Sequence, residues 1–359
     1  MKVAIVHDDL VQWGGAERML LGISEYFPDA PIYTSVFDKH NSLLFKQFKN
    51  KVVFTSFMQK IPGWRSMYKP LFFLYPIAFE QFDFSEYDLV ISQTTRFAKS
   101  IITKPNTLHI CYMHTPPRFL WNFSGEDFPT ILKPLLWWFR LFDKVSGVRP
   151  DFYLAGSKNA AQRISSIYNR NSEVLYPYVD LEKYKDIPVF DGGYYLVISR
   201  LNKYKHVDII VKACKRLGRN LKVVGRGKQF SAIKEEAGSG TEFLQGLPDD
   251  LLTEVIAGCR ALIVAAEEDF GLTPLEAQAI GKPVIALKKG GALETVLEGK
   301  TGVFFENPTV KDLSEAIEQF EKKEFKSEDC ISQAEKFSKK RFLDQLSQLV
   351  EKCRQTKLY

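Results

Sequence analysis

The chain has 359 residues, of which 45% are hydrophobic and 26% charged, and its formal net charge is +6. This length exceeds the usual size of a single hydrophobic core, so we expect two domains. The composition is that of an ordinary globular protein and excludes a largely disordered chain. The cysteines number five and lack C-x-x-C spacing, which predicts free, mostly buried thiols in a reducing cytoplasm.

The hydropathy of the chain predicts no membrane-spanning segment. No stretch reaches the roughly 18 uncharged apolar residues that a transmembrane helix needs. The first apolar run is short and meets Asp8 and Asp9 at once, unlike the longer apolar core of a signal peptide. We therefore expect a protein that is not integral to a membrane.

Short apolar runs alternate with helix-sized or loop-sized gaps along the first half of the chain. These runs cover residues 2–7, 31–37, 51–57, 88–94, 108–114, 151–157 and 173–177. The alternation predicts a parallel sheet with helices on both faces. The first run leads into Gly14-Gly15 and a helical pattern up to residue 27, as in a nucleotide-binding unit, although the G-x-G-x-x-G dinucleotide fingerprint is absent.

The segment 176–193, with two prolines and the pair Gly192-Gly193, reads as a linker. A second series of strand-like runs follows at residues 194–201, 220–226, 241–247, 261–267, 283–287 and 301–306. This series predicts a second doubly wound sheet, and two such sheets joined by a hinge imply a cleft. Residues 327–356 are charged with apolar residues at heptad-like spacing, which predicts helix.

The segment 268–287 is the most informative part of the sequence, because Glu268 and Glu276 stand on either side of an expected helix start. Their spacing alone is weak evidence, since two other glutamate pairs in the chain share it. The context adds specificity: an apolar strand delivers Glu268 to its carboxyl end, Gly271 allows a tight turn, and Thr273-Pro274 reads as the N-cap and first residue of a helix.

Two interpretations compete for Glu276. Thr273 to Glu276 fits a capping box, in which the glutamate only bonds the Thr273 amide. Alternatively, the amides of Leu272, Thr273 and Leu275 lie at the positive end of the helix dipole and bind a diphosphate, while Glu276 holds a ribose and Glu268 faces a sugar.

With the residues around them, Glu268 and Glu276 resemble the E-x7-E signature of the family 4 retaining glycosyltransferases, which have the two-domain GT-B fold. The segment 199–206, SRLNKYKH, resembles the Arg and Lys pair of that family. Gly14-Gly15-Ala16-Glu17 is similar to its glycine-rich N-terminal loop, and residues 224–227 to its next strand end. His114-Thr115-Pro116-Pro117-Arg118, with Trp121 close behind, resembles a subgroup of bacterial surface-polysaccharide mannosyltransferases.

The resemblance implies a GT-B architecture of two Rossmann-like domains that face a cleft. It predicts an acceptor-binding domain over residues 1–182, a nucleotide-sugar-binding domain over 183–339, and a helix over 340–359 that packs back on the first domain. It also implies site residues. The catalytic set is His114, Arg200, Lys205 and Glu268, and the donor set is Gly14, Gly15, Arg200, Lys205, Leu244, Gly271, Leu272, Thr273 and Glu276.

In this interpretation Arg200 and Lys205 neutralise a departing diphosphate. The resemblance implies retention of configuration, GDP-mannose as donor and a lipid-linked saccharide as acceptor, at the cytoplasmic face of the cell membrane. Arg226 departs from the small or acidic residue of many relatives, so a UDP-sugar donor stays open. No D-x-D motif follows a strand, so we expect no metal and no other cofactor.

A basic and aromatic stretch predicts contact with an anionic membrane surface. Residues 39–79 contain no acid, and the segments 61–79 and 131–144 mix Trp, Phe and Leu with Lys and Arg, as interfacial segments do. The residues expected to face the membrane are Lys60, Trp64, Arg65 and Lys69. The alternative is that the aromatics fill the core and the lysines form a solvated face.

Two other functions remain as alternatives. A nicotinamide-linked oxidoreductase would use Asp38 near the end of the second strand, but the missing dinucleotide fingerprint counts against it. A non-catalytic membrane scaffold would use the basic and aromatic surface, but it does not explain the glutamates and cations at the strand ends. No nucleic-acid-binding module frames the basic residues, so nucleic acid is not an expected partner.

Overall fold

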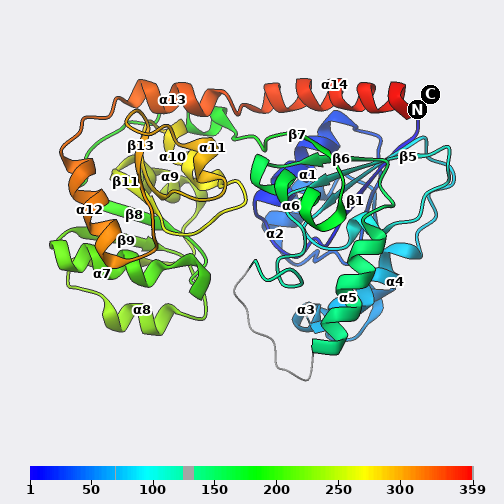
Figure 1. Cartoon of the computed structure of the whole chain (residues 1–359), viewed down its shortest axis with the longest axis horizontal. Coiled ribbons are helices and arrows are strands. Elements are labelled where there is room, and N and C mark those ends of the chain that lie inside the picture. The colour runs from blue at the N-terminus through cyan, green and yellow to red at the C-terminus, as the bar shows by residue number, and fades with distance from the viewer. Residues whose placement is uncertain (69, 124–132, 358–359) are drawn as a thin grey trace. The chain divides into compact units, whose positions relative to one another are not determined.

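The computed structural model describes residues 1–68, 70–123 and 133–357. The chain forms two compact units (Figure 1): Met1–Tyr176 together with Phe342–Tyr359, and Pro177–Arg341. Among the described residues, every helix is too short or too polar to cross a bilayer.

The first unit is built on a 7-stranded sheet in the order β3-β2-β1-β4-β5-β6-β7. Its strands are β1 (Val3–His7), β2 (Ile32–Thr34), β3 (Val53–Thr55), β4 (Leu89–Thr94), β5 (Leu108–Met113), β6 (Phe152–Ala155) and β7 (Ser172–Val174). All neighbouring strands are parallel, with Ile5 opposite Ile32 on one side and Ile91 on the other. The central strands β1, β4 and β5 are buried along their whole length because helices cover both faces of a parallel sheet.

The helices of the first unit follow the expected alternation. They are α1 (Gly15–Tyr26), α2 (Ser42–Phe48), α3 (Trp64–Met67), α4 (Tyr75–Glu80), α5 (Lys133–Ser146) and α6 (Lys158–Tyr168), with 3-10 turns η1 (Phe57–Lys60), η2 (Pro70–Leu74) and η3 (Ala98–Ser100). Because the strand order runs outward in both directions from the centre, right-handed crossovers place these helices on both faces of the sheet. Aromatic side chains such as Phe79, Phe97 and Phe139 fill one core cluster.

The second unit repeats this topology with a 6-stranded parallel sheet in the order β10-β9-β8-β11-β12-β13. Its strands are β8 (Tyr194–Ile198), β9 (Asn220–Val224), β10 (Thr241–Leu244), β11 (Cys259–Val264), β12 (Val284–Leu287) and β13 (Gly302–Phe305). The helices are α7 (Val207–Leu217), α8 (Phe230–Glu236), α9 (Asp249–Ala257), α10 (Leu272–Ala279), α11 (Ala292–Thr295), α12 (Val310–Glu321) and α13 (Ser327–Glu335), with 3-10 turns η5 (Leu181–Tyr184) and η6 (Lys203–Lys205).

The C-terminal helix α14 (Lys339–Lys357) is anchored in the first unit from residue 342 onward. Phe342 is buried against Tyr112 of β5. Tyr26 donates to the Ser347 hydroxyl over 2.7 Å, and Lys357 forms an ion pair with Asp151 at 2.6 Å. The sequence predicted helix across residues 327–356; the structure breaks it between α13 and α14.

Each strand expected from the sequence is present, and the two doubly wound parallel sheets confirm the predicted fold class. The boundaries of the units differ slightly from 182/183 and 339/340, because residues 177–182 belong to the second unit. The Val179 amide donates to the Phe337 carbonyl over 2.8 Å, and Val179 bridges Ser338. The five cysteines are free and buried, as expected.

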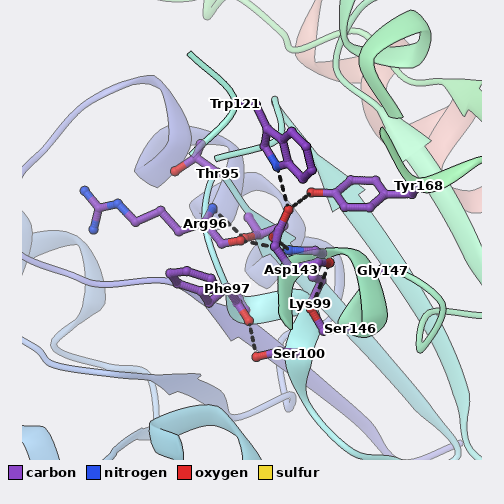
Figure 2. A network of polar contacts seen from close by, with 12 residues as sticks. Thr95, Arg96, Phe97, Lys99, Ser100, Trp121, Asp143, Ser146, Gly147 and Tyr168 are labelled. Carbon is purple, nitrogen blue, oxygen red and sulfur yellow. Dashed lines mark hydrogen bonds and ion pairs between the residues drawn. The ribbon is translucent and has the colours of Figure 1, made fainter. Parts of the chain in front are cut away.

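A fully buried carboxylate ties α5 to η3, to α6 and to the segment between β5 and α5. Figure 2 shows Lys99, Trp121 and Tyr168 converging on Asp143. The Trp121 indole donates to Asp143 over 2.7 Å, the Tyr168 hydroxyl over 2.8 Å, and the Lys99 ammonium forms an ion pair with it. A buried charge needs such partners, because an unpaired carboxylate in an apolar interior is costly.

We expect Lys99→Met to lower the free energy of unfolding by about 3–5 kcal/mol, because it leaves the Asp143 carboxylate buried without its cation. Lys99→Met combined with Asp143→Asn should recover part of this loss. Urea unfolding measures both. Lys352→Met removes a lysine from an exposed pair with Glu173 and should change stability little. Equal losses for the two lysine variants would contradict the role of the buried pair.

Candidate active site

The second unit brings Lys205 and Glu268 together at the point where its strand order reverses. Arg200 and Lys205 follow β8, and Glu268 follows β11, the neighbouring strand. The Lys205 ammonium bonds the Glu268 carboxylate and lies 5.0 Å from the centre of the Tyr204 ring. Carboxyl ends that diverge at a switch point leave room for a ligand, so this pair lies where α/β sheets bind ligands.

The turn that carries Glu268 leads directly into α10. Gly271 has a left-handed backbone with φ of 89° and serves as the N-cap, so Leu272 is the first helical residue. The expectation that Thr273 is the N-cap is wrong by two positions, because the glycine turns the chain earlier. The capping-box interpretation of Glu276 falls with it. Pro274 lies in the first turn, where a missing amide hydrogen breaks no helical bond.

The first turn of α10 still offers an anion site. The amides of Leu272 and Thr273 lie at the positive end of the helix dipole, where anions are stabilised. Glu276, one turn further, is partly exposed and has interactions of its own. Both predicted carboxylates therefore belong to one short stretch of chain that begins at the end of β11.

Glycines let neighbouring loops approach this stretch closely. A Cβ on Gly291 would lie 2.2 Å from the Phe270 Cα, and one on Gly290 would lie 2.3 Å from the Glu268 carbonyl oxygen. The Gly291 amide donates to that same carbonyl over 2.8 Å. The loop after β12 thus holds Glu268 in place. The sequence analysis missed these two residues, although a glycine pair shortly after a strand was the available signal.

Close backbone contact also fixes the loop after β9. A Cβ on Gly225 would lie 1.9 Å from the Ser199 carbonyl oxygen, and one on Gly227 would lie 2.3 Å from that of Leu201. The Gly225 amide donates to the Leu244 carbonyl over 3.1 Å. These contacts pack the loop after β9 against the residues on both sides of Arg200 and against the end of β10. Arg200 itself is exposed on the surface of the unit.

In the first unit, His114 lies beside the glycine-rich loop. It follows β5 and is partly exposed. The Gln93 amide donates both to Nε2 of His114 and to the Ala16 carbonyl, each over 2.6 Å. Burial, helped by the charge of His7, lowers the pKa of His114 to about 4. The imidazole is therefore neutral at neutral pH, with Nε2 accepting a hydrogen bond and its proton on Nδ1.

A second titratable pair, which the sequence analysis did not identify, lies on the same edge of the first sheet. His7 ends β1 and Glu17 lies in the first turn of α1, with 3.9 Å between Nε2 and the carboxylate. Both are buried, and the Glu17 Oε2 has no hydrogen-bond partner among the described residues. Burial opposes protonation of His7. The hydrogen bond with Glu17 and the charge of Glu17 outweigh this effect, so the pKa of His7 is raised above its usual value.

The carboxylates of Asp8 and Asp9 have structural roles. Asp8 accepts from the amides of Phe97 and Ala98 over 3.0 and 2.8 Å, and so fixes the turn that leads into η3. Asp9 accepts from the Tyr75 hydroxyl over 3.1 Å and pairs with Arg96. Across the described residues, no group of three or more His, Cys, Asp or Glu side chains could hold a metal ion.

The residues expected to face a membrane differ in their exposure to solvent. Trp64 is buried in the aromatic core with Phe79 and Phe139, so its expected membrane contact is wrong. Lys60 and Arg65 are exposed, and Lys69 lies outside the described residues. Arg65 forms an ion pair with Asp38 at 3.0 Å. The carboxylate that a nicotinamide enzyme would need is therefore already paired.

Comparison with known proteins agrees with this architecture. Residues 182–337 match the family model described as Glycosyl transferases group 1. The chain is 25% identical over 407 residues to the alpha-1,3/1,6-mannosyltransferase ALG2 of Mus musculus, covering 98% of this chain and 96% of the relative. It is 28% identical to a GDP-mannose-dependent alpha-(1-6)-phosphatidylinositol monomannoside mannosyltransferase of Mycolicibacterium smegmatis, covering 45% and 50% of the two chains. The crystal structure of Anabaena Alr3699/HepE in complex with UDP-glucose superposes with a TM-score of 0.70 at 18% identity, covering 98% and 100%.

Two doubly wound parallel-sheet units define the GT-B class of fold. Residues 182–337, which lie within the second unit, match a glycosyltransferase group 1 domain, and the relatives of the chain include mannosyltransferases. The resemblance to family 4 glycosyltransferases is thereby confirmed. The roles of the individual site residues stay predictions.

We expect Gly291→Ala to lower turnover at least about tenfold, because the added methyl group forces the loop that carries Glu268 to move. The variant should also lose about 1–3 kcal/mol of stability. Gly299→Ala is the control, since that glycine has φ of 76° but nothing within 4 Å of its Cβ position. It should lose stability through backbone strain alone and keep its turnover. Equal turnover losses would contradict the proposed contact.

We expect the free energy of unfolding to fall at acidic pH because His109 is buried in its neutral form. This side chain of β5 bonds Ser92 over 2.8 Å, and burial lowers the pKa of His109 to about 3. The unfolded chain therefore binds the proton first, and the free energy of unfolding falls as the pH drops from about 6.5 toward about 3. The pKa of His114 acts in the same direction and the raised pKa of His7 in the opposite one.

Urea unfolding at about pH 7 and about pH 5 tests this linkage. The loss of stability between the two should be about 2 kcal/mol smaller in His109→Gln than in the unchanged protein. An identical pH dependence of the two proteins would show that His109 is protonated equally in both states.

Proposed function

We propose that the chain transfers mannose from GDP-mannose to a lipid-linked saccharide, with retention of configuration and without a metal ion. One observation carries the proposal: the Lys205–Glu268 pair lies beside the first turn of α10 at the switch point of the second unit. A cation and a helix N-terminus at one place suit a diphosphate leaving group, whose negative charge grows in the transition state.

Each residue has a defined part in this reaction. Arg200 and Lys205 neutralise the diphosphate, the first as a planar guanidinium and the second as a point charge. The Leu272 and Thr273 amides add hydrogen bonds to it, and Glu276 binds the ribose hydroxyls. Glu268 orients Lys205 and faces the sugar.

The first unit supplies the remaining groups. His114 is neutral, and its Nδ1 proton is the one left for a sugar hydroxyl. Gly14 and Gly15 bring the amino end of α1 to the same edge of that sheet as His114. Leaving-phosphate oxygen accepts the proton of the acceptor hydroxyl on the same face of the sugar, which retains the anomeric configuration.

The choice of mannose and of guanine rests on relatives. A mannosyltransferase matches the chain along nearly its whole length, and a second relative is named as GDP-mannose-dependent. The lipid-linked acceptor and a place at the cytoplasmic face of the cell membrane follow from the same resemblance. A UDP-sugar donor is the second candidate, because the structural relative from Anabaena was crystallised with UDP-glucose and because Arg226 is unusual.

Isothermal titration with a panel of nucleotide sugars tests the donor. GDP-mannose should bind at least about tenfold more tightly than UDP-glucose, and EDTA should leave turnover unchanged. Tighter binding of a UDP-sugar would show that the donor is that UDP-sugar and not GDP-mannose. Loss of turnover in EDTA would refute the metal-free mechanism. NMR of the product decides stereochemistry, since an inverted linkage excludes the retaining reaction.

We expect Arg200→Ala and Glu276→Ala each to lower turnover about a hundredfold or more, because each removes a charged contact to the donor. Arg216→Ala and Glu315→Ala remove exposed charges elsewhere in the same unit and should be nearly unchanged. Turnover close to that of the unchanged enzyme in Arg200→Ala or Glu276→Ala would remove that residue from the site.

A further inference from the structure

The inner side of α5 is held rigidly against the first unit. Leu136 and Phe139 pack in the aromatic core together with Trp64. Asp143 is fully buried and accepts from the Trp121 indole, with Lys99 as its counterion (Figure 2). These contacts fix the rotation of the helix about its own axis, so one side of α5 faces outward.

The outward side of α5 is unusually apolar for a surface. Five large apolar side chains are exposed there: Leu135, Trp137, Trp138, Leu141 and Val145. The indoles are the most notable, with exposed fractions of 64% for Trp137 and 50% for Trp138. Exposed apolar patches mark interaction sites, and Trp is enriched where an apolar phase meets water.

Positive charge lines one flank of this apolar side. Lys133, Arg140 and Lys144 are all exposed, and their spacing of seven and four residues places them along one line of the helix. Asp143 is the one acid within residues 133–146, and it is turned inward and neutralised. The outward surface therefore combines tryptophan, aliphatic side chains and cations without a carboxylate of its own.

We propose that the outward side of α5 is a membrane-docking surface that lies in the interface of an anionic bilayer. The apolar side chains would enter the acyl boundary while the lysines and the arginine contact lipid phosphates, the arrangement of an interfacial amphipathic helix. The proposal deepens the proposed function, on which it rests for the lipid-linked acceptor, by assigning the surface that meets the membrane. The earlier candidate Trp64 belongs instead to the layer beneath this helix.

Co-sedimentation of the full chain with vesicles tests the proposal. Binding to equimolar phosphatidylglycerol and phosphatidylcholine should greatly exceed binding to phosphatidylcholine alone and should weaken as salt rises. Trp137→Ser with Trp138→Ser should lower the partition coefficient about tenfold or more. Lys133→Glu with Lys144→Glu should lower it about thirtyfold. Brominated lipids should quench the tryptophan fluorescence of the unchanged protein.

Matched controls lie in the second unit. Leu251→Ser removes an exposed apolar side chain there, and Lys322→Glu with Lys323→Glu makes the same change of net charge. Both controls should keep vesicle binding. Thermal unfolding checks that each variant is folded, and a donor hydrolysis assay without vesicles checks that its active site is intact.

Unchanged vesicle binding by the tryptophan variant would overturn the assignment of α5, whatever the donor. So would a concentration-dependent dimer, seen by sedimentation velocity, that the tryptophan variant abolishes, because a second copy would then cover this surface. If vesicle binding behaves as expected while GDP-mannose does not bind, the docking surface stands and the proposed donor fails.

Discussion

The reversal of strand order at the centre of each sheet is the constraint on which the candidate sites of this protein depend. In the second unit, β8 leads outward to β9 and β10 while β11 leads the other way to β12 and β13. The loops that leave β8 and β11 must therefore diverge, and the space at their carboxyl ends is bounded by backbone. Lys205 and Glu268 belong to these two loops and meet across that space.

Close backbone packing turns that topology into a defined geometry. The loops after β9 and β12 approach those that carry Lys205 and Glu268 so closely that Gly225 and Gly291 have no room for a Cβ. Close packing of this kind fixes the loops when the chain folds, so their conformational entropy is lost at that step. The ion pair alone would be weak, since both side chains are partly exposed to water. Its geometry therefore depends on the loops and not on the attraction between the two charges.

Much of the fold could be predicted from sequence, and the reasons for the failures are local. The strands were found because a buried parallel strand is apolar along its whole length, a signal that needs no tertiary information. The start of α10 was misplaced because Thr-Pro is a strong cap signal, whereas the left-handed turn at Gly271 begins the helix two residues earlier. Trp64 was assigned to the surface because composition cannot distinguish an aromatic core with a basic rim from an interfacial segment. The partners of Asp143 lie 44, 25 and 22 residues away along the chain, beyond any local pattern.

The two units use one topology for opposite electrostatic purposes. At the switch point of the second unit, the cations Arg200 and Lys205 follow β8, acidic side chains that include Glu268 follow β11, and the helix that begins after them presents its positive end. At the switch point of the first unit, the side chains at the strand ends are His7, Asp8, Gln93 and His114, and Glu17 lies in the first turn of α1. The Asp8 carboxylate accepts hydrogen bonds from backbone amides, and burial lowers the pKa of His114 so that its imidazole is neutral. A diphosphate would be repelled by Glu17 and Asp8, whereas a sugar hydroxyl can donate to a carboxylate and accept from Nδ1 of a neutral imidazole. Under the proposed reaction, the same carboxyl edge of a sheet thus selects the donor diphosphate in one unit and sugar hydroxyls in the other, through the side chains that follow its strands.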